Sequence, residues 1–100
     1  MRAGDTIVAL SSGSVPSGVA VLRISGPETG RMVASLIGRL PAERRLVFSA
    51  IRSRDGTLLD EGLVAWFPAP RSFTGEDCAE LHVHGSAAVV RALLREPSGW

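Results

Sequence analysis

The residues best suited to chemistry gather in one short stretch near the end of the chain. SFTGEDCAELHVHG, Ser72–Gly85, contains three carboxylates, two histidines and the single cysteine, Cys78. Carboxylates and imidazoles can move protons, hold a metal ion or orient a ligand, and a thiolate can act as a nucleophile. The sequence therefore indicates that this stretch is the candidate site, and the other elements must hold it in place.

A metal ion is the first possibility for this stretch. Alternation along its strand places three potential ligands on one face, where alternate residues lie roughly 6.5–7 Å apart: Glu80, His82 and His84. Two histidines at that spacing can share a zinc ion, but a structural site needs a fourth protein ligand and none is obvious. We therefore favour half-buried histidines that hydrogen-bond to their neighbours, with no metal bound.

Cys78 begins a strand rather than a helix, which favours a buried, unreactive thiol.

Arg23 is the natural partner of Glu80. It lies in Val19–Ser25 (VAVLRIS), the strongest strand signal in the chain, and alternation puts it on the same face as Val21. Both charges stand on strands otherwise suited to burial, and buried charges need partners. They form an internal ion pair, or they receive a ligand with an N–H edge for the carboxylate and an anionic end for the arginine. The residue types alone leave both readings open.

A polar loop leads into the last strand and is a candidate lining for a pocket. Loops of this kind often line binding sites, and the equally good alternative is a connection whose acids cap its own backbone amides. No residue of the chain is predicted to be catalytic. The candidate lining residues are Ser72, Phe73, Thr74, Gly75, Glu76 and Asp77.

The elements that must position these residues follow from hydrophobic patterning. Strands are expected at Thr6–Leu10, Val19–Ser25, Arg45–Ser53, Leu58–Phe67 and from Asp77 or Cys78 to Val83, with helices after Ser25 and Ser86. This order predicts an α+β fold, a single mixed-sheet domain of about five strands with two helices. We expect residues 1–94 to form the domain and residues 95–100 to be a divergent or truncated tail.

Three local signals refine the boundaries of these elements. Ser25, followed three residues later by Glu28, predicts a capping box at the start of the first helix. The Asp55-Gly56 pair predicts a tight turn between the third and fourth strands, and Ser86 predicts the cap of the last helix. The polar run Asp60–Gly62 inside the fourth strand suggests a bulge.

Composition limits the classes of protein that fit. The chain has 100 residues, a net charge of +1, one cysteine and no lysine among its eleven basic residues. The absence of lysine excludes a Walker A loop and a Schiff-base lysine within this chain. A near-neutral charge argues against direct binding of nucleic acid or a membrane, and a lone cysteine suits a reducing compartment. The start of the chain lacks a signal-peptide pattern. We expect a cytoplasmic domain.

Four segments carry a family resemblance. They keep their order and spacing: DTIVAL (Asp5–Leu10), VLRISG (Val21–Gly26), DGTLLDEGLVAWFPAPRSFTGED (Asp55–Asp77) and ELHVHG (Glu80–Gly85). In these segments the chain resembles the N-terminal domain of the bacterial tRNA-modification GTPases of the MnmE/TrmE family. SFTGED followed by E-L-x-x-H-G is far more specific than a lone glycine motif.

The resemblance implies a function that the residue patterns alone do not give. It implies a domain that binds a reduced folate such as 5-formyltetrahydrofolate, forms homodimers, and resembles the folate-binding part of the glycine-cleavage aminomethyltransferase. The parent family hydrolyses GTP and modifies the wobble uridine of tRNA together with a flavoprotein, MnmG. The family's folate contacts correspond to Arg23 and Glu80, and a further contacting lysine lies beyond residue 100.

Several parts of the parent family have no counterpart in this sequence. The GTPase domain, which would use GTP, magnesium and potassium, is absent, as is the family's reactive C-terminal cysteine, whose role Cys78 does not inherit. We therefore expect the domain alone not to be catalytic. The alternatives are a structural dimerisation module without a ligand and, with less support, a one-carbon transferase or a metal-binding domain.

Overall fold

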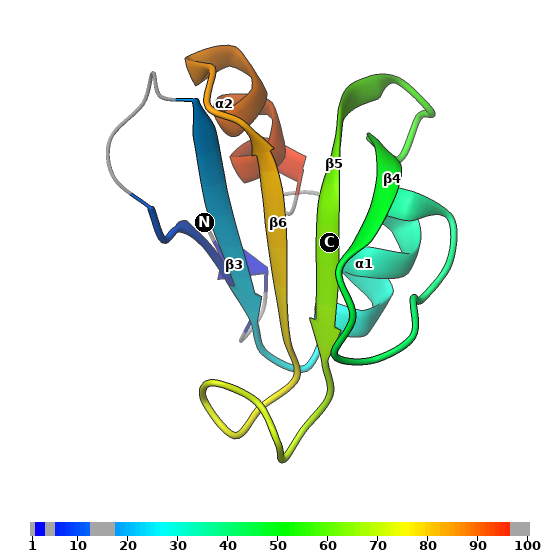
Figure 1. Ribbon diagram of the computed structural model, residues 1–100, viewed down its shortest axis with the longest axis vertical. Helices are drawn as coiled ribbons and strands as arrows, with labels where there is room; N and C mark the ends of the chain where they lie inside the picture. Colours follow the sequence, from blue (N-terminus) through cyan, green and yellow to red (C-terminus); the bar gives the residue numbers. More distant parts are fainter. Residues whose placement is uncertain (1, 4–5, 13–17, 97–100) are drawn as a thin grey trace.

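A single antiparallel sheet organises the fold. The computed structural model describes residues 2–3, 6–12 and 18–96. Its elements are β1 (Arg2–Ala3), β2 (Thr6–Leu10), β3 (Val19–Ser25), α1 (Thr29–Ile37), β4 (Val47–Arg52), β5 (Leu58–Phe67), β6 (Cys78–His84) and α2 (Ala87–Arg95). The strands run in the order β1-β2-β3-β6-β5-β4 (Figure 1). The predicted α+β class with two helices is confirmed.

The sheet differs from the prediction in three details. Its pairings are antiparallel throughout rather than mixed, and the short strand β1 adds to the five strands expected. The third strand is also shorter than predicted, since it begins at Val47 rather than Arg45. These differences leave β3 and β6 at the centre, where they pair along their whole length.

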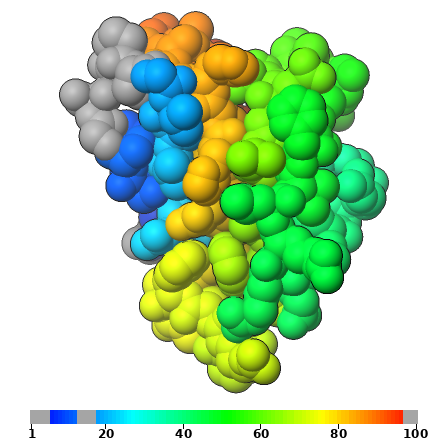
Figure 2. All heavy atoms as spheres, in the orientation of Figure 1, coloured from blue at the N-terminus to red at the C-terminus, as the bar shows by residue number. Residues whose placement is uncertain are grey.

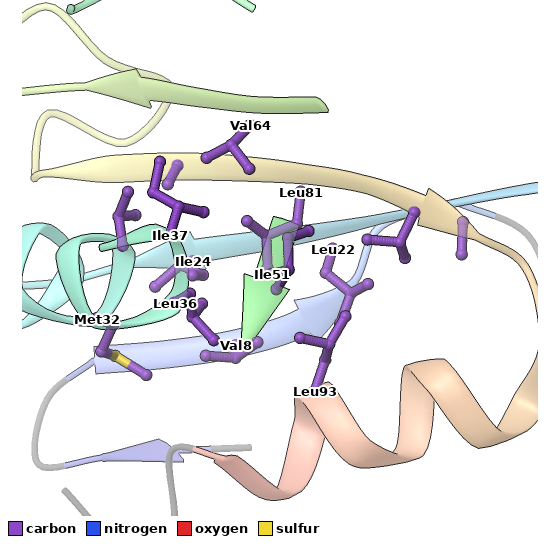
Figure 3. Close-up of a cluster of buried hydrophobic side chains, with 14 of the residues drawn as sticks. Val8, Leu22, Ile24, Met32, Leu36, Ile37, Ile51, Val64, Leu81 and Leu93 are labelled. Carbon is purple, nitrogen blue, oxygen red and sulfur yellow. The ribbon is translucent and has the colours of Figure 1, made fainter. Parts of the chain in front are cut away.

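The two helices cover one face of the sheet and enclose the core. Alternation along β3 is as predicted, because Ala20, Leu22 and Ile24 point into this core and are essentially unexposed. The helices also bury apolar residues against the sheet, among them Met32, Val33 and Leu36 of α1 and Val90 and Leu93 of α2. Figure 3 shows the packed side chains between sheet and helices, among them Val8, Leu22, Ile24, Met32, Leu36, Ile37, Ile51, Val64, Leu81 and Leu93.

The helix starts show one correct and one wrong prediction. Ser86 caps α2 as expected, since its Oγ accepts a hydrogen bond from the backbone N of Val89 at 3.0 Å. The capping box at Ser25 and Glu28 is wrong: α1 begins at Thr29 and its N-cap, Glu28, makes no side-chain capping bond. The backbone N–H of Glu28 instead donates to Thr6 Oγ1 on β2 at 2.8 Å, so a residue distant in sequence satisfies it.

The hairpin between β4 and β5 is confirmed, but its bulge is displaced from the predicted position. The register shifts where Ile51 pairs with Asp60 and Arg52 pairs with Leu58, so the extra residue precedes the Asp60–Gly62 run. Gly62 stays in the ladder for a steric reason. A Cβ there would lie 2.2 Å from the carbonyl oxygen of His82, so only glycine allows β5 and β6 to approach this closely.

The end of the chain only partly tests the predicted domain boundary. α2 continues to Arg95, one residue past the expected limit, and residues 97–100 lie outside the described part of the chain. The boundary of the tail therefore stays a prediction. In the described residues, no helix has the length and apolar character needed to cross a membrane.

The second face of the sheet carries no helix. Figure 2 views this open face, with the loop of residues 68–77 at its lower end. Large apolar side chains stand exposed on it, notably Phe48 on β4 (66% exposed) and Val19 on β3 (59% exposed). The same face carries the charged residues that the sequence singled out.

Candidate functional site

The site is built from two neighbouring strands at the centre of the open face. Arg23 on β3 and Glu80 on β6 are direct cross-strand partners, although 57 residues separate them in sequence. Arg23 Nη2 donates to Glu80 Oε2 at 3.0 Å. Two charges predicted from separate strands therefore meet, and the ion pair proposed from their burial is present.

Glu80 is held ionised by its neighbours. Its side chain is 17% exposed, and its other oxygen, Oε1, lies 3.1 Å from His82 Nε2. Burial by itself would raise the pKa of Glu80, but the hydrogen bonds from His82 and Arg23 outweigh it and place the pKa below its ordinary value. Near neutral pH the site therefore presents a carboxylate, which is an acceptor only.

Arg23 is positioned by an aromatic ring as well as by Glu80. Its guanidinium carbon lies 4.2 Å from the centroid of the Phe73 ring, a cation–π contact. Phe73 in turn packs edge-on against Phe67, with ring centroids 5.0 Å apart. Arg23 Nε is buried without a hydrogen-bond partner, the one such side-chain nitrogen or oxygen among the described residues. A buried donor without a partner is costly, so the site holds an unused hydrogen bond.

The loop of residues 68–77 is fastened to the turn between β3 and α1. The carbonyl oxygen of Asp77 accepts from the backbone N of Gly26 at 2.9 Å and lies 3.1 Å from the buried hydroxyl of Thr29. The carboxylate of Asp77 accepts from the backbone N of Ala69 at 2.8 Å, and Ser72 donates to the carbonyl of Glu76. Asp77 thus caps a backbone amide of its own loop, as the alternative interpretation predicted for the loop's acids. Phe73, by contrast, contacts the guanidinium of Arg23.

Cys78 lies in a small polar cluster beneath this loop. Its Sγ is 3.2 Å from Thr74 Oγ1 and 3.4 Å from Ser25 Oγ, and the two hydroxyls are 2.9 Å apart. Burial would raise the pKa of the thiol, but hydrogen bonds led by those of Ser25 and Thr74 lower it instead. The side chain is fully buried, as expected of a structural cysteine.

The two histidines serve different carboxylates. His82 contacts Glu80, whereas His84 Nδ1 lies 2.8 Å from Asp60 Oδ1 on β5 and its backbone N donates to Asp60 Oδ2 at 2.8 Å. Burial opposes ionisation of Asp60, but these contacts lower its pKa. Within the part of the chain that the structure describes, no three metal-ligating side chains come together. Of the three ligands that alternation had grouped, His82 stays with Glu80 whereas His84 is paired with Asp60.

Sequence reasoning missed two contributors to the site. Phe67 packs against Phe73 beside Arg23, and only Phe73 was among the predicted lining residues. Asp60, which orients His84, was assigned to a bulge. No local signal reveals either contact, because each joins elements whose juxtaposition depends on the sheet order.

Comparison with the sequences of known proteins identifies the family of the chain. The family described as "GTP-binding protein TrmE N-terminus" matches residues 6–98. The tRNA modification GTPase MnmE of Rhizobium meliloti is 57% identical over 96 residues, 96% of this chain and 22% of the relative. Those of Mesorhizobium japonicum and Rhodopseudomonas palustris are 55% identical over 100 residues and 50% identical over 96. These matches cover 100% of this chain and 23% of the first relative, and 96% of this chain and 22% of the second.

The chain thus spans less than a quarter of the length of these relatives. Both the family match and the identities extend over nearly all of it. The chain belongs to the MnmE/TrmE family, of which it is the N-terminal domain.

Proposed function

We propose that this domain binds a reduced folate, such as 5-formyltetrahydrofolate, over the Arg23–Glu80 pair on the open face of the sheet. The observation that carries the proposal is an ionised carboxylate paired at 3.0 Å with a guanidinium on the open face of the sheet, where the arginine side chain is 39% exposed. The family resemblance supports the proposal, because it implies folate contacts at the same two residues.

Glu80 is suited to the N–H edge of a pterin ring. A carboxylate offers about four lone-pair positions, and Arg23 and His82 use one on each oxygen. The remaining positions can accept two parallel hydrogen bonds from a ring N–H and an adjacent amino group, a bidentate geometry with charge assistance. The lowered pKa of Glu80 keeps it in the accepting form.

Arg23 is suited to a polar or anionic part of the same ligand. Its guanidinium is fixed on two sides, by Glu80 and by the ring of Phe73, so little side-chain freedom is lost when a ligand binds. Its side chain is still 39% exposed and therefore accessible. Because Nε itself is buried, a ligand would accept from the terminal N–H groups of the guanidinium.

Isothermal titration of the domain with 5-formyltetrahydrofolate tests the proposal. We expect saturable binding that Glu80→Gln weakens by about ten- to a hundredfold, the value of one or two charge-assisted hydrogen bonds. Glu61→Gln is the matched control, since Glu61 is exposed on the same face of β5 and contacts neither Arg23 nor Glu80. Absence of saturable binding at millimolar ligand, or equal loss in both variants, would refute the assignment.

We propose the remaining properties of the family for the longer protein to which this domain corresponds. Wobble-uridine modification of tRNA, GTP hydrolysis with magnesium and potassium, and partnership with an MnmG-type flavoprotein need parts that this sequence does not contain. The domain by itself supplies binding rather than catalysis. A tRNA-modifying assembly would work in the cytoplasm, where its substrate is found.

Self-association is a second candidate function, with or without a ligand. It is favoured by the large apolar side chains that the open face leaves exposed, including Val19, Phe48 and Leu63. Gel filtration with light scattering tests it, and Phe48→Glu should shift a dimer toward monomer. A wild-type domain that stays monomeric at high concentration would exclude homodimerisation by this fragment.

A further inference from the structure

A hollow of cationic character adjoins the charged pair. It has a volume of about 330 Å³ and lies where β5 ends and the loop of residues 68–77 begins. Two arginines and two phenylalanines dominate its lining, which comprises Arg44, Phe67, Arg71, Ser72 and Phe73. Phe73 is shared with the first site, because its ring also contacts the guanidinium of Arg23. The two sites therefore have a wall in common.

Arg44 is held in an unusual conformation at this hollow. Its φ is 63°, and it is the one non-glycine residue with a positive φ among those described. Its backbone N donates to the carbonyl of Trp66 at 2.8 Å, and its Nη2 donates to the carbonyl of Arg71. These bonds fix the arginine against both β5 and the loop.

The two arginines have hydrogen-bonding capacity to spare. A guanidinium carries five N–H donors, and Arg44 uses one of them in the bond to Arg71. Arg71 makes no side-chain hydrogen bond or ion pair with any described residue. Neighbouring guanidiniums repel each other, so a bound anion would be stabilised by both. Glu76 is on the same loop but does not line the hollow.

The hollow at the opposite end of the open face is not lined by arginines. The hollow there is lined by Glu61, His82 and His84, and His84 is already engaged by the carboxylate of Asp60. Carboxylates of a ligand would meet like charge in that direction. A long ligand whose N–H edge binds Glu80 is therefore directed past the aromatic rings toward the arginines.

We infer that the hollow of Arg44 and Arg71 binds the carboxylates of a folate's glutamate tail, with Phe73 and Phe67 flanking the aromatic ring that joins tail to pterin. The inference rests on the proposed folate function and adds a preference for polyglutamylated forms. Each added glutamate brings further carboxylates to a site that has two guanidiniums. The tail should contribute little when salt screens the charges.

Calorimetric titration with the mono- and triglutamate forms of 5-formyltetrahydrofolate tests this inference. We expect the triglutamate to bind about three- to tenfold more tightly at low salt, the range of one or two exposed ion pairs. Arg71→Gln should abolish this ratio and change monoglutamate binding much less. Arg91→Gln on α2, an exposed arginine remote from both hollows, is the matched control and should preserve the ratio.

The outcomes separate the two proposals. Equal affinities for the two forms in the wild type would overturn the tail site while leaving folate binding intact. Failure of both forms to bind would overturn both proposals. If Arg71→Gln left the ratio unchanged but weakened binding of a tRNA anticodon stem-loop, the hollow would be a phosphate contact for RNA and the tail site would be wrong.

Discussion

Gly62→Ala tests the idea that the site depends on a close approach of β5 and β6. The added Cβ would lie 2.2 Å from the carbonyl oxygen of His82 and 3.2 Å from its carbonyl carbon, whereas real Cβ atoms essentially never approach closer than 3.0 Å. The obstacle is backbone in the middle of a sheet rather than the end of a flexible side chain. The two strands must separate by nearly 1 Å, which disturbs the ladder on both sides of His82.

Overpacking of this kind costs about 2–3 kcal/mol of unfolding free energy. In a domain of this size each kcal/mol corresponds to a fall of about 4–8 °C in Tm, so we expect a loss of about 8–24 °C. Urea unfolding followed by circular dichroism gives the free energy directly, with thermal melts as a check. Because His82 contacts Glu80, the variant should also weaken folate binding under conditions where it remains folded.

Gly18→Ala provides the control for this substitution. A Cβ at Gly18 meets nothing within 4 Å, so the change should alter stability by no more than about 0.5 kcal/mol. If Gly62→Ala proved as mild as Gly18→Ala, the close approach of the strands would not be what requires a glycine.

Three further predictions follow from contacts in and around the site. The lowered pKa of Glu80 means that its ionised form stabilises the fold: the contribution is present above the ordinary carboxylate pKa and is lost as pH falls through the lowered one. Acid unfolding should therefore be shallower in Glu80→Gln than in wild type; equal slopes would contradict this. Thr74→Val removes a hydrogen bond from Cys78 and should raise the thiol pKa, measured by thiolate ultraviolet absorbance with Cys78→Ser as the blank; an unchanged titration would count against the cluster. Ser86→Ala should cost about 1 kcal/mol in urea unfolding and Ser86→Gly only a few tenths, and equal losses would argue against a capping role.

The sequence predicted the parts of the fold that depend on local pattern. Alternation in β3 correctly separated the buried Ala20, Leu22 and Ile24 from the face of Arg23, because a pleated strand imposes a period of two. Ser86 was identified because a cap is a contact within one turn of helix. The same reasoning failed at Ser25, whose hydroxyl bonds to Thr74, 49 residues away, in place of the helix start.

The candidate site was predictable in its members but not in its geometry. Arg23 and Glu80 stood out because each places a charge on an apolar strand, and that signal is local. Their direct pairing required the strand order, in which β6 lies between β3 and β5. The wall of Phe67 and Phe73 and the hollow of Arg44 depend on how a long loop folds back, for which a single sequence carries no periodic signal.

The central position of β6 has a consequence for the order in which the fold is made. β6 leaves the ribosome after the other described strands, yet it joins two halves of the sheet that cannot otherwise meet, β2–β3 on one side and β4–β5 on the other. Until it arrives, each half exposes an unpaired inner edge rich in apolar side chains, the kind of surface that aggregates or recruits chaperones. The candidate site is therefore completed together with the fold, because Glu80 lies on the strand whose insertion completes the sheet.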